Sequence, residues 1–319
     1  MDKKSVLIVG FGVMGCRHAQ SFLDKKKDYE VHILEPSDES IKQNIKRINA
    51  EKSDFIWYKN IDNIPLLDIA IIATSSYPRF EIVKNLIKMG YKKFLLEKVV
   101  FQSEKQFSTI IKMIDESDSV AYCNFVNRYF VAYNNIKKQL DRSNKKININ
   151  VLGGALQLGL GCNAIHYIDI LQYLTNNDEI QLTEFNLQLL ESENRRGSMY
   201  KEFYGMIQLA NKGGDTITLN SELGLKQDIT ISISQGEKTF LLNEGTGKLF
   251  ISDKSASSIT DFTIIPSSKL THTIIEDIFK NKCTLTKLDQ TLLSHTSLFR
   301  AFNNVLHNNH TSDTLCPIT

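Results

Sequence analysis

The chain has 319 residues, which is enough for two domains of ordinary size. Hydrophobic residues make up 42% and charged residues 23%, a balance typical of a soluble globular protein. No apolar run is long enough to span a bilayer, which argues against a membrane protein. The net charge of +2 argues neither for nor against nucleic acid, and no Lys/Arg block stands out. We therefore expect neither a membrane nor a nucleic acid as partner.

Cysteine usage and the first residues bear on the compartment. Five cysteines are scattered with no metal-type pair: Cys16, Cys123, Cys162, Cys283 and Cys316. This pattern suits free thiols in a reducing cytosol, so we expect a cytoplasmic protein without a metal site. The N-terminus superficially resembles a signal peptide, but glycines interrupt it and no small-residue cleavage site follows. We therefore expect no targeting segment.

The chain opens with an apolar run, Val6 to Val9, followed by glycines spaced as Gly10-x-Gly12-x-x-Gly15. The run is typical of a buried parallel strand. Gly10 permits a tight turn, Gly12 lets a pyrophosphate approach bare main chain, and Gly15 lets the next helix pack closely. A helix beginning near Val13 would face its N–H groups toward the phosphates. The predicted cofactor site includes Gly10, Phe11, Gly12, Val13, Met14 and Gly15.

Glu35 stands at the end of the next predicted strand, 30–34, twenty residues past Gly15. A carboxylate there can accept both ribose hydroxyls of adenosine and would repel a 2′-phosphate. No Arg or Lys follows directly, so we favour NAD(H) over NADP(H). The alternative is a strand-end glutamate without a ligand. His18 could approach the phosphates or simply pack on the first helix.

Strands and helices alternate as far as residue 124. We expect strands at 55–58, 67–73, 94–96 and 120–124, helices at 37–49 and 104–116, and a helix that Ser76 caps and Gly90 stops. This predicts a doubly wound parallel sheet, in which ligands bind beyond the carboxyl ends of the strands. One crevice at those ends should hold the glycines, Glu35 and a further set: Thr74, Ser75, Ser76, Tyr77, Glu97 and Lys98.

The pattern changes near residue 123, so we expect a nucleotide-binding domain over 1–122 and a substrate and oligomerisation domain over 123–319. We predict a helix ending near Leu140, a strand at 147–152, a glycine-rich stretch at 153–161 and a helix at 163–174. From 180 to 253 apolar residues recur mostly at every second position between glycine turns, which predicts an antiparallel sheet. Helices at 269–280 and 287–306 follow, and 311–319 should be a loose tail.

Two side chains could carry proton chemistry. Lys98 closes a strand at the predicted nucleotide site, where it could orient substrate hydroxyls and shuttle protons. Hydride transfer to or from a carbinol carbon needs a partner that gives or takes the hydroxyl proton, and an imidazole such as that of His166 titrates in the right range. Asp169 lies on the same helical face and could hold the ring or balance its charge. The alternatives are an ordinary surface lysine and a histidine that pairs with an aspartate for stability alone.

These features together resemble the glucose-fructose oxidoreductase / inositol dehydrogenase / rhizopine-catabolism (Gfo/Idh/MocA) family. The resemblance rests on the glycine turn, on Glu97-Lys98, on the Arg128 region and on Gly159-x-Gly161 leading to His166-x-x-Asp169. It covers nearly the whole chain. It implies an α/β fold, with a Rossmann domain followed by an α+β domain built on a large open, mainly antiparallel sheet.

The resemblance also implies an activity, namely NAD-dependent oxidation or reduction at one carbon of a sugar, nucleotide sugar or related polyol. Lys98 would bind substrate hydroxyls and assist proton transfer, and His166 would be the acid/base. Asp169 would support the helix or contact substrate, and Asn124 and Arg128 would lie near the nicotinamide and substrate. Thr74 to Tyr77 and Glu97 would line the cofactor. Family members often associate through the open sheet, so we expect a homodimer or homotetramer.

Two departures from the family pattern affect this site. Members usually carry Glu-Lys-Pro, whereas here Val99 follows Lys98 and the Lys98–Val99 bond should be trans. Many members place an Asp four residues before the histidine, where this chain has Cys162, a thiol that relays protons poorly near pH 7. Asn163 and His166 lie three apart on one helix, so Asn163 could bind substrate instead.

Two other classes of function stay open. One is an epimerase or lyase that retains its cofactor and uses transient oxidation, with no net redox change. The other is a ligand-sensing homologue that has lost catalysis, an idea that the missing proline and aspartate favour and the presence of Lys98 and His166 opposes.

Overall fold

The computed structural model describes residues 3–141, 145–191, 197–308 and 311–319. Its contacts divide the chain into two compact units. Unit 1 comprises Met1–Phe101, Ser108–Asn124 and Ile265–Leu288, and unit 2 comprises Gln102–Phe107, Phe125–Ile264 and Asp289–Thr319. No helix in these described ranges has the length and apolarity needed to cross a bilayer.

Unit 1 is built on a six-stranded parallel sheet with the strand order β3-β2-β1-β4-β5-β6. Its strands are β1 (Lys4–Val9), β2 (Tyr29–Leu34), β3 (Ile56–Tyr58), β4 (Ile69–Ile72), β5 (Lys93–Leu96) and β6 (Val120–Cys123). The central strands read as continuous apolar runs because both faces of the sheet are covered, and Ile8 and Ile71 are fully buried. The predicted doubly wound parallel sheet is confirmed.

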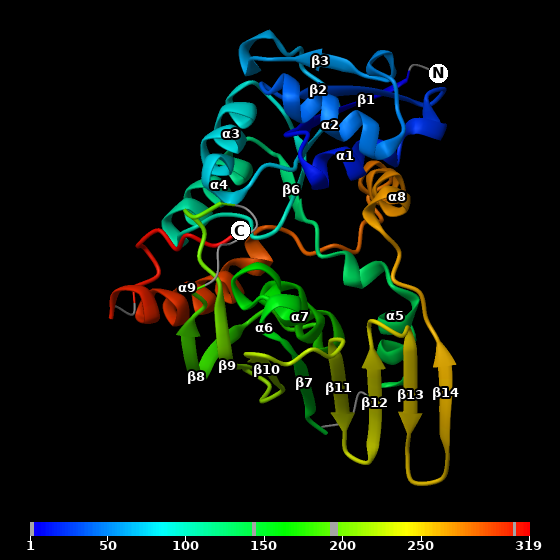
Figure 1. The fold of residues 1–319 in the computed structure, drawn as a ribbon, viewed down its shortest axis with the longest axis vertical. Helices are drawn as coiled ribbons and strands as arrows, with labels where there is room; N and C mark the ends of the chain where they lie inside the picture. The colour runs from blue at the N-terminus through cyan, green and yellow to red at the C-terminus, as the bar shows by residue number, and fades with distance from the viewer. Residues whose placement is uncertain (1–2, 142–144, 192–196, 309–310) are drawn as a thin grey trace. The chain divides into compact units, whose positions relative to one another are not determined.

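Helices cover both faces of this sheet, with α1, α2 and α8 on one side and α3 and α4 on the other (Figure 1). Their bounds are α1 (Val13–Gln20), α2 (Asp38–Ile48), α3 (Ser76–Lys88), α4 (Glu104–Glu116) and α8 (Ser267–Phe279). The first residues of α4 group with unit 2. One-turn 3-10 helices lie at Leu23–Lys25, Lys52–Asp54 and Ile61–Asn63. The N-cap of α3 is Ser75, not Ser76 as predicted, because Ser75 has extended backbone (φ −62°, ψ 165°) and Ser76 is already helical.

Unit 2 is built on an eight-stranded sheet with the order β14-β13-β12-β11-β7-β10-β9-β8. Its strands are β7 (Ile147–Gly154), β8 (Ile180–Leu189), β9 (Phe203–Asn211), β10 (Thr216–Glu222), β11 (Thr230–Gln235), β12 (Lys238–Asn243), β13 (Lys248–Ser252) and β14 (Ser257–Asp261). Among the described residues of this sheet, β7 and β10 alone pair in parallel, so the sheet is mainly antiparallel, as predicted.

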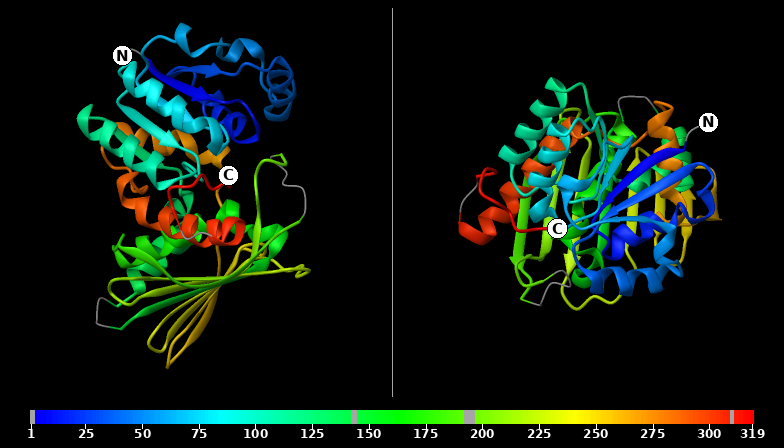
Figure 2. Two further views of the ribbon diagram at one scale, coloured as in Figure 1. Left: turned by 90° about the vertical axis from the view of Figure 1, so that its left-hand side faces the viewer. Right: turned by 90° about the horizontal axis from the view of Figure 1, so that it is seen from above.

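The helices of unit 2 pack on one face of its sheet (Figure 2). They are α5 (Val131–Gln139), α6 (Ala155–Leu158), α7 (Leu160–Thr175) and α9 (Leu292–His307), with 3-10 turns at Val126–Tyr129 and Asp289–Thr291. The helix-covered face holds the alternating apolar residues, such as Ile217 and Leu219, which are fully buried. The opposite face carries hydroxyl and amide side chains such as Thr218, Asn150 and Ser232.

Two segments of the large sheet and its flanking helices differ from the sequence predictions. Strand β7 extends past its predicted end at residue 152 to Gly154, and α6 forms at once after it within the glycine-rich stretch. Strand β14 was not predicted, since all of its residues are exposed and only Ile259 among them is apolar. It pairs with β13 at the sheet edge through the backbone and through the Lys248–Asp261 ion pair.

The C-terminal residues are packed and not a loose tail. Cys316 and Ile318 are fully buried, and Thr319 is nearly so. The Cys316 N–H donates to Gln102 O at 2.7 Å, and the Lys201 N–H donates to Pro317 O at 2.7 Å. The prediction failed because polar composition suggests a free end, whereas these backbone hydrogen bonds and two apolar side chains anchor the segment within unit 2.

Candidate functional site

The glycine turn between β1 and α1 has the backbone geometry that the spacing predicts. Gly10 has φ +88°, a conformation that side-chain-bearing residues rarely adopt. A Cβ on Gly15 would lie 1.9 Å from Gly10 O, so only glycine lets α1 pack this close to the turn. A Cβ on Gly12 would meet no atom within 4 Å, so the main chain there faces open space. The first and third glycines shape the turn, and the second leaves it accessible.

The start of α1 offers free backbone donors to a ligand. Gly12 is the N-cap, no side chain caps the helix, and Val13 is 58% exposed. The first N–H groups of a helix have no intrahelical partner and form an anion site together with the helix dipole. Phe11 contributes differently from its neighbours, because its N–H donates to Glu35 Oε2 at 2.8 Å and its ring packs against Trp57 at 5.0 Å.

Glu35 lies at the carboxyl end of β2 and is nearly buried. Its Oε2 accepts from the Phe11 N–H and its Oε1 from the Ser37 N–H at 2.9 Å. Each oxygen can accept a second hydrogen bond, so the carboxylate is fixed beside the glycine turn and still able to bind ribose hydroxyls. No Lys or Arg directly follows Glu35 in the sequence, but Lys59 lies nearby in the fold. Its Nζ pairs with Asp38 Oδ1 at 2.5 Å.

The ends of β4 and β6 carry further predicted cofactor residues. Thr74 and Ser75 are half-buried, Ser76 is buried and Tyr77 is 58% exposed. Two buried oxygens at these strand ends, Thr74 Oγ1 and Asn124 Oδ1, have no hydrogen-bond partner in the described part of the chain. Unpaired buried acceptors, the open space at Gly12 and the uncapped α1 together fit a dinucleotide at this edge.

Glu97, at the end of β5, is buried within a polar cluster. Its Oε1 accepts from Asn124 Nδ2 at 2.6 Å and lies 3.0 Å from His18 Nε2. Burial alone would raise the pKa of Glu97, but the hydrogen bond and charge of His18, followed by Asn124 and Lys98, outweigh it and lower this pKa to about 2. Glu97 is therefore an anion at neutral pH, and it immediately precedes the half-buried Lys98.

The Lys98–Val99 peptide bond is cis, and the predicted trans bond is therefore wrong. Arg79, a buried residue that the sequence analysis did not select, contacts the backbone on both sides of this bond. Its guanidinium donates to the main-chain oxygens of Thr74, Glu97 and Val99 and, at 3.1 Å, to that of Val100. These hydrogen bonds, which join segments distant in sequence, override the local preference that the prediction used.

A second group of predicted residues lies in unit 2. Asp169 on α7 is fully buried, and its two oxygens accept from Arg128 Nε and Nη2 at 2.8 Å each. Asn163 Nδ2 donates to Leu158 O at 2.8 Å. The half-buried His166 ring packs edge-on against Phe125, with centroids 5.8 Å apart. Asp169 thus holds Arg128 in a bidentate ion pair.

The predicted residues therefore form two groups, one in each unit. Unit 1 gathers the glycine turn, Glu35, the Thr74–Tyr77 segment, Glu97, Lys98 and Asn124 at the carboxyl ends of its strands. Unit 2 holds Arg128, Asn163, His166 and Asp169. Two residues at this edge of unit 1 were not predicted, because no motif surrounds them: Arg79, and Thr271, whose Oγ1 lies 2.9 Å from His18 Nδ1.

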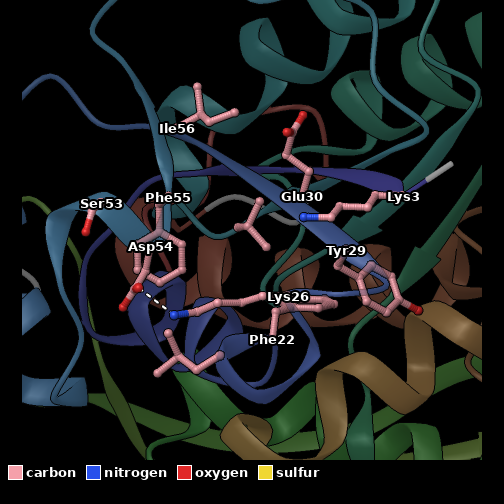
Figure 3. Close-up of a pocket in the computed structure, with 11 residues that line it drawn as sticks. Lys3, Phe22, Lys26, Tyr29, Glu30, Ser53, Asp54, Phe55 and Ile56 are labelled. Atoms are coloured by element: carbon pink, nitrogen blue, oxygen red, sulfur yellow. Dashed lines mark hydrogen bonds and ion pairs between the residues drawn. The ribbon is translucent and has the colours of Figure 1, made fainter.

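Figure 3 shows a cavity of about 310 Å³ elsewhere in unit 1. It is lined by residues at the amino ends of β1, β2 and β3, among them Lys3, Tyr29 and Ile56. Parallel sheets bind their ligands at the carboxyl ends, and the Lys26–Asp54 ion pair at 2.5 Å balances charge here. This cavity is separate from the candidate site.

Comparison with protein families supports the nucleotide-binding assignment. Residues 4–125 match the model of GFO_IDH_MocA, described as an oxidoreductase family with an NAD-binding Rossmann fold. The resemblance drawn from the motifs and the NAD-type cofactor are thereby confirmed. No curated protein matches the chain.

The same fold occurs in solved structures of proteins from several organisms, of which three are described. An oxidoreductase from Agrobacterium radiobacter, in complex with NAD+, L-tartaric acid and magnesium, is 12% identical with a TM-score of 0.73 and covers 97% of this chain and 98% of its own. UDP-N-acetylglucosamine 3-dehydrogenase GnnA from Acidithiobacillus ferrooxidans is 13% identical with a TM-score of 0.72, covering 93% and 96%. A super-repressor mutant of Gal80p from Saccharomyces cerevisiae is 14% identical with a TM-score of 0.73, covering 97% of each chain. At these identities the likeness shows the fold alone.

Proposed function

Through residues 4–125 the chain belongs to the Gfo/Idh/MocA oxidoreductase family, and on that premise we propose that it is an NAD(H)-dependent oxidoreductase. Its substrate would be a sugar, nucleotide sugar or related polyol, with hydride moving to or from a carbinol carbon. One observation carries the proposal: Lys98 follows β5 at the same edge of the parallel sheet where β1 ends in the glycine turn. When bound, the nicotinamide ring would supply or accept the hydride.

The proposed role of each site residue follows from the chemistry of its donor or acceptor groups. The N–H groups of Val13 and Met14 bind phosphate, and Glu35 accepts ribose hydroxyls. Lys98 orients the substrate hydroxyl and assists transfer of its proton, and His166 is the acid/base. Arg128 and Asn163 contact substrate. The buried Asp169 supports this role by holding the Arg128 guanidinium in one orientation.

We prefer NAD(H) to NADP(H) because the surroundings of Glu35 are poorly suited to a 2′-phosphate. The carboxylate itself would repel that phosphate. The nearby cation Lys59 is engaged by Asp38 and by Pro36 O at 3.1 Å.

Turnover assays that follow nicotinamide absorbance test the activity. The protein is incubated with NAD+ and a panel of nucleotide sugars, free sugars and inositols, and a steady absorbance change is expected with at least one. Lys98→Ala should bind NAD+ normally and lose turnover, whereas normal turnover in this variant would remove Lys98 from the mechanism. Product formation without a steady absorbance change would favour the cofactor-retaining epimerase or lyase. Binding without turnover across the panel would favour the sensing homologue, the reading that Cys162 supports.

We further propose that the chain works in the cytoplasm as a homodimer or homotetramer associated through the helix-free face of its large sheet. None of the five cysteines forms a disulfide within the described residues, which suits a reducing compartment. The large sheet has its helices on one face (Figure 2), leaving the other available to a second copy. Light scattering on the purified protein measures the assembly size directly, and a monomer at working concentration would overturn this proposal.

A further inference from the structure

Arg79 lies in the first turn of α3 and is only 1% exposed. A guanidinium has five N–H donors, which need acceptors when the side chain is buried, so arginine is seldom enclosed in this way. Arg79 Nη1 donates to the main-chain oxygens of Glu97 and Val99 and, at 3.1 Å, to that of Val100. Its Nη2 donates to Thr74 O. One side chain within unit 1 therefore joins two backbone segments that are distant in sequence.

These two segments continue the neighbouring strands β4 and β5 beyond their carboxyl ends. The strands pair in parallel, and β4 ends at Ile72. Among the described residues, the last backbone hydrogen bond between the two chains runs from the Glu97 N–H to Ile72 O at 3.0 Å. Beyond that point it is the guanidinium of Arg79, bound to Thr74 O on one side and to Glu97 O on the other, that holds the segments together.

The main chain on both sides of Lys98 is fixed by this arrangement. On the preceding side, the Glu97 carbonyl is bound by Arg79 and its carboxylate accepts from Asn124 Nδ2 at 2.6 Å. On the following side, Val99 is 1% exposed and its carbonyl is also bound by Arg79. Lys98 itself is half-buried. The point from which the lysine side chain starts is therefore set by contacts of its two neighbours.

The placement of Lys98 relative to Thr74 matters for the proposed reaction. Thr74 begins the proposed cofactor segment, and Lys98 is the proposed partner of the substrate hydroxyl. A displacement of about 1 Å between reacting groups can lower turnover roughly 100-fold. Arginine suits the task because its planar guanidinium holds several donors in a fixed arrangement, whereas the single Nζ of a lysine cannot serve both segments at once.

We propose that Arg79 is a positioning residue, which fixes the main chain on both sides of Lys98 to the Thr74 segment and so keeps the lysine in one place relative to the cofactor. The catalytic consequence rests on the proposed function, whereas the anchoring of the main chain does not. The two parts are therefore tested separately, with Arg79→Lys as the variant that keeps a donor but loses the fork. Arg47→Lys, at an exposed position on α2, is the matched control.

Hydrogen exchange followed by mass spectrometry tests the anchoring on the protein without cofactor. In the wild type, residues 97–101 should exchange as slowly as β5, and exchange like that of an open loop would overturn the proposal even if no variant folded. In Arg79→Lys, exchange of 97–101 should accelerate at least ~10-fold while that of β1 stays unchanged, because only the local opening becomes easier. Equal acceleration of both segments would show a merely structural residue. Arg47→Lys should exchange like the wild type.

Steady-state kinetics on a substrate that the panel reveals test the consequence for catalysis. Arg79→Lys should lower kcat about 10- to 100-fold, since Lys98 no longer keeps its place. KM and NAD+ affinity should change less than about threefold, because the phosphates and the ribose are assigned to the glycine turn and Glu35. A lower melting temperature with unchanged kcat would refute the positioning role. Absence of turnover in the wild type would overturn the proposed function instead, and the exchange comparison would still decide whether Arg79 anchors this segment.

Discussion

Replacing Gly15 by alanine should damage both stability and cofactor binding, by an amount that the geometry bounds. The added Cβ would lie 1.9 Å from Gly10 O and 2.8 Å from Gly10 C, whereas real Cβ atoms essentially never approach within 3.0 Å. Helix α1 and the turn must therefore separate by about 1 Å. Overpacking of this kind typically costs ~1–3 kcal/mol, which should lower the melting temperature by roughly 5 °C in a chain of this size.

Gly12→Ala is the matched control, because its Cβ would meet no atom within 4 Å. Its melting temperature should stay within about 1 °C of the wild type. The methyl group would, however, occupy space that we assign to the pyrophosphate, so NAD+ affinity should fall at least ~10-fold, or about 1.4 kcal/mol. Gly12→Ala should therefore weaken NAD+ binding without lowering stability, whereas Gly15→Ala should weaken both.

Thermal unfolding by circular dichroism and calorimetric titration with NAD+ measure the two quantities. If Gly15→Ala melted and bound like the wild type, the close contact between α1 and the turn would be wrong. If Gly12→Ala bound NAD+ with unchanged affinity, the pyrophosphate could not rest on this turn.

Three further predictions use other parts of the chain. Glu35→Gln should weaken NAD+ binding about 10-fold and narrow its advantage over NADP+, because the amide no longer repels a 2′-phosphate; an unchanged ratio in competition titrations would contradict this. The Glu97 pKa falls from 4.5 to about 2 on folding, so its ionised form adds about 3 kcal/mol of stability above pH 4.5 that is lost as pH falls toward 2. Urea midpoints of wild type and Glu97→Gln should therefore converge over that window, and parallel curves would refute the assignment. Ile318→Ala removes a fully buried side chain and should cost about 3 kcal/mol, whereas Leu315→Ala, at a position 48% exposed, should cost under about 0.5 kcal/mol; equal urea midpoints for the two variants would indicate a loose end.

Much of unit 1 could be predicted because its signals are local. The apolar run and the glycine spacing reflect contacts between residues a few positions apart in the sequence. The acidic residue at the end of the next strand reflects a contact between two adjacent strands. Gly10 and Gly15 accordingly have the turn conformation and the close helix contact that the spacing indicated, and Glu35 lies at the end of β2 as expected.

The parts that could not be predicted depend on pairs distant in sequence. Arg79 reaches the carbonyls of Glu97 and Val99, and Thr271 reaches His18 across more than 250 residues of chain. No periodicity or motif around Arg79 or Thr271 predicts such contacts. The packed C-terminal segment is a similar case, because its partner Gln102 lies near the start of α4.

Titration of the wild-type protein with NAD+ and NADP+ by calorimetry tests the central claim most directly, since it needs no knowledge of the substrate. The glycine turn, the uncapped start of α1 and the fixed Glu35 predict saturable binding of NAD+, tighter than that of NADP+. Absence of heat with both nucleotides, under conditions where the protein is folded, would contradict the assignment of this sheet edge as a dinucleotide site.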